Sequence, residues 1–249
     1  MKATGQKSNV YCVLGMHRSG TSCLAGIIKA SGVEFGDVVT SAPHNKKGNQ
    51  ENLEIRAVND EVLAENGGTW DNPVDVVTWT EEQAGRRDRI IAQFESLGAA
   101  RWAFKDPRTV FTLPFWRDGI SALKLIGSVR HPVLVAKSLA ARDHIALPQG
   151  LMLWERYNRR ILEEWRHAPF SIIRFDQPQE LYLAAVSRVL EEIRCEKKDL
   201  SFFDLALVHE SSDGGEQLPL APRAREVWDA LAAIAGSRNP AAVLAGSQR

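Results

Sequence analysis

Eight residues near the N-terminus, Gly15 to Ser22, combine glycines, hydroxyls and a cation in the sequence GMHRSGTS. They follow an apolar run, Asn9 to Leu14, that is typical of a buried strand, and they open a helical pattern over Thr21 to Ala30. Glycine lets the backbone turn sharply, so consecutive N–H groups and the positive end of the helix dipole can converge on one anion. The segment therefore predicts a phosphate-binding loop between a strand and a helix.

The spacing of this loop matches the Walker A pattern G-x-x-x-x-G-K-[ST], except that Thr21 stands where nucleotide-triphosphate enzymes place a lysine. That lysine reaches the β- and γ-phosphates, so its absence favours a ligand with one phosphate at this point. The cation of the loop is Arg18 instead. Two alternatives stay open for this segment: a small-molecule P-loop kinase, and a strand-to-helix turn without a ligand.

The variant R-S-G-T-[ST] resembles the 5′-phosphosulfate loop of bacterial and Golgi-type sulfotransferases, which use 3′-phosphoadenosine 5′-phosphosulfate (PAPS). The resemblance implies a P-loop NTPase-like sulfotransferase fold. It also implies in-line, metal-independent transfer of a sulfuryl group to an acceptor hydroxyl or amine, with PAP as the product. The residues it assigns to PAPS in this loop are His17, Arg18, Ser19, Gly20, Thr21 and Ser22, and Arg18 is also expected to be catalytic.

A second anion site is predicted where the strand Leu123 to Val129 ends. Arg130 follows it directly and offers a planar fork of donors suited to a phosphate, and Ser138 lies in the helix that Pro132 begins. Arg142, four residues later, shares that helix face. Taken alone, the segment favours a surface arginine and a serine of an amphipathic helix. Together with the loop, it resembles the 3′-phosphate signature of the same family, which implies that all three residues bind PAPS.

Lys105 to Arg108 reads KDPR at the end of another predicted strand. It is similar to the KDPR stretch of bacterial sulfotransferases, where the lysine lies near the transferred group. The resemblance therefore implies a catalytic Lys105, and we place Arg108 among the substrate-binding residues. Arg174 to Asp176 is similar to a strand end of mainly structural role in the family. The chain lacks the R-K-G-x-x-G segment of the cytosolic eukaryotic branch, so the mode of adenine binding is left open.

The base that accepts the proton of the acceptor is predicted to be Glu51, with Asp37, His44 and His17 as further candidates. A helix is expected over residues 50–65, with Ile55, Val58 and Val62 on its buried face, so Glu51 at its first turn would project inward. The region 45–54 also resembles the N-x-x-G-x-x-E segment of bacterial sulfotransferases. The alternative is that Glu51 only stabilises the helix N-terminus.

The acceptor is expected to be a carbohydrate or another small molecule, contacted by Asp37, His44 and Arg108. Two polar, irregular stretches, residues 32–48 and 69–80, are predicted to shape its pocket because loops near strand ends commonly carry binding residues. Tryptophan and phenylalanine residues between 70 and 116 could stack on sugar rings, although most are expected to fill the core.

Strands and helices alternate along the chain, which predicts an α/β fold with a mostly parallel central sheet flanked by helices. The expected strands are 9–14, 102–105, 123–129 and 170–175, and the expected helices are 21–30, 50–65, 81–97, 132–143, 151–166, 178–193 and 224–234. No long linker divides the sequence. We therefore expect one domain over 1–249, with a flexible leader at 1–8, a loop at 210–222 and a capping helix at 224–236.

The composition narrows the function further. Thirty-one Lys and Arg residues balance 31 Asp and Glu residues, which argues against a nucleic-acid partner. No apolar run is long enough for a membrane span and no signal peptide is indicated, so a cytoplasmic protein is expected. The three cysteines show no metal-ligand spacing, and no metal is expected. The oligomeric state is not indicated. A nucleotide-binding scaffold that has lost turnover stays open beside the enzyme.

Overall fold

The structure is a computed structural model that describes residues 8–43, 45–75, 77–204 and 219–237. Residues 1–7 of the expected leader, most of the expected loop at 210–222 and the candidate base His44 lie outside the described residues. Among the described residues, no helix is both long and apolar enough to cross a membrane.

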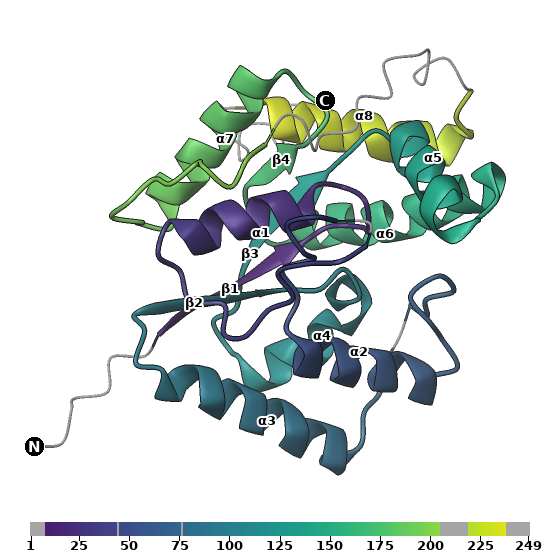
Figure 1. The fold of residues 1–249 in the computed structure, drawn as a ribbon. Coiled ribbons are helices and arrows are strands. Elements are labelled where there is room, and N and C mark those ends of the chain that lie inside the picture. The colour runs from purple at the N-terminus through teal and green to yellow at the C-terminus, as the bar shows by residue number, and fades with distance from the viewer. Residues whose placement is uncertain (1–7, 44, 76, 205–218, 238–249) are drawn as a thin grey trace, which may run out of the picture.

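The sheet has four parallel strands in the order β2-β1-β3-β4 (Figure 1). The strands are β1 Asn9–Leu14, β2 Arg101–Lys105, β3 Lys124–Val129 and β4 Ile172–Arg174. The chain leaves β1 for β2 on one side and then returns to β3 on the other side of β1. In such a sheet, ligands bind beyond the carboxyl ends of the strands, where the strand order reverses.

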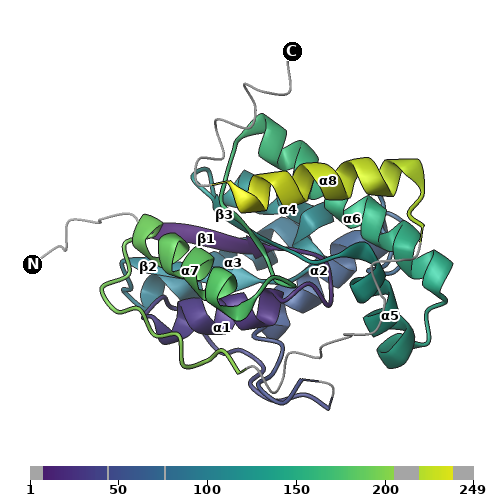
Figure 2. The same cartoon turned by 90° about the horizontal axis from the view of Figure 1, so that it is seen from above.

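Helices cover both faces of the sheet, as the fold class predicted. The helices are α1 Thr21–Ala30, α2 Leu53–Glu65, α3 Glu81–Ser96, α4 Thr109–Gly119, α5 Pro132–Asp143, α6 Leu147–His167, α7 Gln179–Glu192 and α8 Pro222–Gly236. Helices α1 and α7 lie side by side on one face of the sheet (Figure 2). Alternate residues of β1 point to opposite faces: Tyr11 and Val13 pack with α1 and α7, whereas Val10 and Cys12 join the larger core with α2 to α6 and α8. The two cores hold the strands of the sheet in place, including the ends at which the site lies.

Sequence patterning missed one helix, α4. Seven of its residues between Thr109 and Trp116 are buried, so it has no polar face from which a helical period could be read. Pro114 within the segment also disfavours a helix. Tertiary packing overrides both signals, because α4 lies inside the larger core.

Two predicted boundaries were wrong for identifiable reasons. Helix α2 begins at Leu53 rather than residue 50, because the side chain of Asn52 caps it by accepting hydrogen bonds from the backbone N–H groups of Glu54 and Ile55. Helix α6 begins at Leu147, one turn before the predicted start, with a proline in its first turn. The first shift matters for the site, because it leaves Glu51 in the preceding loop.

Candidate active site

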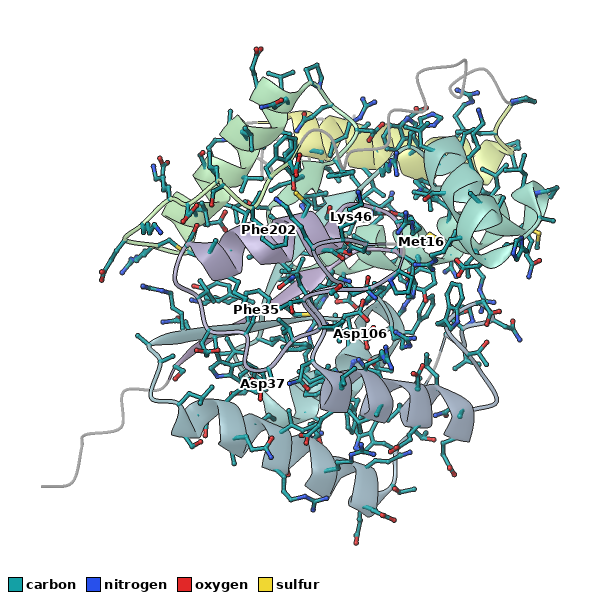
Figure 3. All side chains as sticks on the ribbon, in the orientation of Figure 1. Met16, Phe35, Asp37, Lys46, Asp106 and Phe202 are labelled. Carbon is teal, nitrogen blue, oxygen red and sulfur yellow. The ribbon has the colours of Figure 1, made fainter. Side chains whose placement is uncertain are left out.

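A cleft of about 840 Å³ lies at the carboxyl ends of the strands. Its walls come from the loop after β1, Pro43 and the segment 45–56, the end of β2 and helix α5, with Trp70 and Phe175. Its charged lining residues are Arg18, Lys46, Lys47, Arg56, Lys105, Arg108, Arg130, Lys137, Arg142, Glu51, Asp143 and Asp204. In Figure 3, Lys46 and Phe202 of this lining lie on the α1 side, and Asp106 lies on the α2 side. The excess of cations predicts an anionic ligand.

The backbone of the loop after β1 is held against β3. Gly15 packs so closely that an added Cβ would lie 2.5 Å from the carbonyl oxygen of Ser128. The Ser128 hydroxyl donates a 2.6 Å hydrogen bond to the carbonyl of Ser19, and Gly20 has a φ of 81°, which favours glycine. Helix α1 then begins at Thr21, so its N-terminal N–H groups face the cleft.

Residues predicted for the two ends of the nucleotide lie side by side. The Nε of Arg18 donates a 2.8 Å hydrogen bond to the hydroxyl of Ser138, and Arg130 donates to the carbonyl oxygen of Arg18 at 3.3 Å. Burial and the neighbouring cations Arg142 and Arg130 lower the pKa of Arg18 to about 10, so it remains charged at neutral pH. In the sequence, Arg18 is 112 positions from Arg130 and 120 positions from Ser138, and the fold joins the three residues in one cationic cluster.

Lys105 and Glu51 form a buried ion pair at the end of β2. The ammonium Nζ lies 2.6 Å from Oε1 of Glu51, and the two side chains are 3% and 6% exposed. The same ammonium donates to the carbonyl of Asn49 at 3.2 Å and to the hydroxyl of Ser22 at 3.4 Å. The pair fixes the carboxylate at the end of β2 and connects it, through Lys105 and Ser22, to the first turn of α1.

Glu51 lies in a tight loop before α2, and not in the first turn of that helix as expected. Gly48 has a φ of 72°, and an added Cβ would lie 2.2 Å from the carbonyl of Val39. Gln50 also has a positive φ, and backbone hydrogen bonds join Gln50 and Glu51 to Val39. This crossing of two segments turns the carboxylate inward toward β2.

Asp106, within the KDPR stretch, is fully buried and organises its neighbours. Its carboxylate accepts hydrogen bonds of 3.0 Å from Asn59 of α2 and from the backbone and guanidinium of Arg108. Burial raises the pKa of Asp106 despite these donors. Burial alone would lower the pKa of Arg108, but Asp106 and Asp60 outweigh it and raise that pKa. Asp106 therefore fixes Arg108 at the rim of the cleft.

Asn59 was missed by sequence reasoning, although a signal was present. It is a polar residue within the buried stripe of α2, beside Val58. Its amide oxygen accepts hydrogen bonds from Thr112 at 2.6 Å and Trp116 at 2.8 Å, both on α4. A buried amide with both ends satisfied fixes α2 against α4, and α2 in turn carries Arg56 to the cleft.

The His17 ring lies against aromatic residues of the cleft wall. Its centroid is 4.7 Å from that of Trp70 and 6.1 Å from that of Tyr157. Its Nε2 is buried and has no hydrogen-bond partner among the described residues. Burial, followed by Arg108, Lys105, Arg142 and Arg18, lowers the pKa of His17 well below its ordinary value, so the ring is neutral near pH 7.

Of the remaining predicted residues, some line the cleft and others do not. Asp37 is exposed and does not line the cleft, and it lies toward α3 in Figure 3. Arg142 lines the cleft, where its Nε is 2.7 Å from a carboxylate oxygen of Asp143. Both irregular stretches expected to shape the pocket contribute lining residues, Trp70 among them. Within the described ranges, no group of three or more His, Cys, Asp or Glu residues is arranged to hold a metal ion.

Comparison with known proteins identifies the fold. No protein-family profile matches the sequence, and no curated protein matches it either. A solved structure, the sulfotransferase domain of the olefin synthase from Synechococcus PCC 7002, aligns with a TM-score of 0.60. The alignment covers 93% of this chain and 98% of that domain at 15% identity. The chain has the α/β fold of a sulfotransferase domain, as predicted.

Proposed function

We propose that this protein is a PAPS-dependent sulfotransferase that acts on a hydroxyl or amine of a carbohydrate or another small molecule. One observation carries the proposal: the loop after β1, the Lys105–Glu51 pair and the Arg18–Ser138–Arg130 cluster converge in one cleft on this fold. The similarity to a sulfotransferase domain supports the same reaction class.

The donor set of the cleft suits PAPS. The N–H groups at the start of α1, with Thr21 and Ser22, would hold the 5′-phosphosulfate. Arg130 and Ser138 would hold the 3′-phosphate, since a guanidinium and a hydroxyl both donate to phosphate oxygens. The volume of about 840 Å³ is that of a small-molecule or cofactor site. When bound, PAPS supplies an activated sulfuryl group.

The residues of the chain would divide the chemistry between them. Glu51 is buried, paired with Lys105 and within the cleft, so it would accept the proton of the acceptor. Lys105 and Arg18 would stabilise negative charge that develops on the transferred oxygens, an effect that is strongest in a site shielded from water. The core of the sheet holds these groups in place before the reaction begins.

Isothermal titration calorimetry with PAP and AMP tests the proposal. PAP should bind much more tightly than AMP, because only PAP carries the 3′-phosphate that Arg130 and Ser138 suit. Arg130→Ala should cost about 2–5 kcal/mol of PAP binding, the usual result of removing one partner of a buried charged contact. Arg89→Ala, which removes an exposed arginine of α3 outside the cleft, is the matched control.

Equal affinity for PAP and AMP would reject the assignment. Sulfuryl transfer to a panel of glycan, lipid and natural-product acceptors, followed by mass spectrometry, then separates an enzyme from a nucleotide-binding scaffold. A scaffold would bind PAP and show no transfer.

A further inference from the structure

The cleft holds more positive charge than the proposed nucleotide contacts account for. Nine lysines and arginines line it against three carboxylates. Each carboxylate has a basic partner in the cleft: Glu51 with Lys105, Asp143 with Arg142, and Asp204 with Lys47. By contrast, Lys46, Arg56 and Lys137 form no ion pair with any described residue. Unneutralised cations that face one cavity repel each other, and an anion would relieve that repulsion.

Part of this charge gathers on the wall that carries Trp70. The guanidinium of Arg142 lies 5.9 Å from the centre of the Trp70 ring, and His17 packs on the same indole. Arg108 is held beside this wall by Asp106 and by Asp60 of α2. Arg56 lies one helical turn before Asp60 and also lines the cleft. Arg142 therefore lies over this aromatic surface, and Arg108 and Arg56 line the same cleft.

Arg142 pairs with one carboxylate and Arg108 with two, and neither pairing uses every N–H donor of the guanidinium. The Arg142 side chain is 20% exposed and that of Arg108 is 11% exposed, and both line the cleft. A guanidinium has five N–H donors in a rigid fork, so one carboxylate leaves donors that can bind a second anion. The wall therefore offers charge and directed hydrogen-bond donors together.

His17 borders the same wall. Burial is the largest cause of its lowered pKa, and four nearby cationic side chains add to it. Its buried Nε2 has no hydrogen-bond partner among the described residues, and His17 itself lines the cleft. A buried polar atom without a partner is costly unless a ligand or solvent satisfies it. A bound anion with a hydroxyl or acid oxygen would satisfy it.

We propose that the acceptor carries a carboxylate, phosphate or sulfate group, and that Arg56, Arg108 and Arg142 bind this group beside Trp70. This assigns Arg142 to the acceptor and not, as the sequence led us to expect, to PAPS. The proposal rests on the proposed function, because it assigns the acceptor class of the same reaction. A ring of the acceptor would pack on the indole of Trp70, and the charged group would select against neutral analogues. The anion thus orients the acceptor hydroxyl or amine toward Glu51.

The test uses inorganic sulfate as the probe on the PAP-saturated protein, at constant ionic strength set with chloride. Calorimetry measures sulfate affinity, and NMR of the His17 imidazole reports its pKa. Sulfate should bind saturably and raise the His17 pKa, because a nearby anion stabilises the imidazolium. Arg56→Gln should weaken sulfate binding about tenfold, as expected for a partly exposed charged contact, and leave PAP affinity unchanged. Arg89→Gln is the matched control and should change neither.

Two outcomes would overturn this proposal while leaving the proposed function intact. One is tight PAP binding without any saturable sulfate effect on His17. The other is sulfate binding that Arg56→Gln does not weaken, which would place the ion elsewhere, such as beside the 5′-phosphate. Failure of PAP itself to bind would instead reject the proposed function.

Discussion

We expect the two single variants of the Lys105–Glu51 pair to lose different amounts of unfolding free energy. Lys105→Met leaves a buried carboxylate without its cation, and breaking such a pair costs about 3–5 kcal/mol of unfolding free energy. Glu51→Gln should cost less, about 1–3 kcal/mol, because Lys105 keeps the carbonyl of Asn49 and the hydroxyl of Ser22 as partners. The double variant removes both charges, so its stability should return to within about 2 kcal/mol of the parent.

Urea unfolding measures these differences, provided that the m-value stays constant across the series. Turnover with PAPS and an identified acceptor is measured in parallel. Each single variant and the double variant should lose about 10²–10⁴-fold in kcat, since general acid–base catalysis contributes that much, whereas Glu51→Gln should leave PAP affinity nearly unchanged. The reasoning would be refuted if Lys105→Met were no less stable than Glu51→Gln. Recovery of turnover in the double variant would show that the pair is only structural.

Three further predictions concern the loop and its surroundings. Turnover should persist in EDTA, because no divalent ion is expected to take part; complete and reversible loss would point to a kinase. Gly20→Ala should destabilise the fold by about 1–3 kcal/mol, since φ is 81° and the new Cβ would lie 2.2 Å from Phe175, and a thermal unfolding midpoint equal to the parent would contradict this. The folded-state pKa of His17 lies below its unfolded value near 6.5, so the unfolded chain binds the extra proton at acidic pH. The free energy of unfolding should therefore fall as the pH drops from about 7.5 to 5.5. His17→Gln should flatten this pH dependence, which urea titrations at several pH values measure.

Local sequence was sufficient for the framework of the site. The strand before Gly15, the glycines of the loop and the start of α1 are encoded within about twenty consecutive residues, because turn chemistry and apolar periodicity act over short distances. The same holds for β3, Arg130 and the first turn of α5. The alternation of such units then predicted a parallel sheet, and with it the edge at which the cleft lies.

Only the tertiary structure decided which of these groups meet. Helix α4 forms because seven of its eight residues from Thr109 to Trp116 pack into the core, so no amphipathic pattern marked it. Glu51 meets Lys105 across 54 residues because segment 39–51 folds onto itself and turns the carboxylate toward β2. Arg18 meets Ser138 across 120 residues because β1 and β3 are neighbours in the sheet. Contacts of this kind depend on packing between distant elements, and a local pattern of residue types carries no information about that packing.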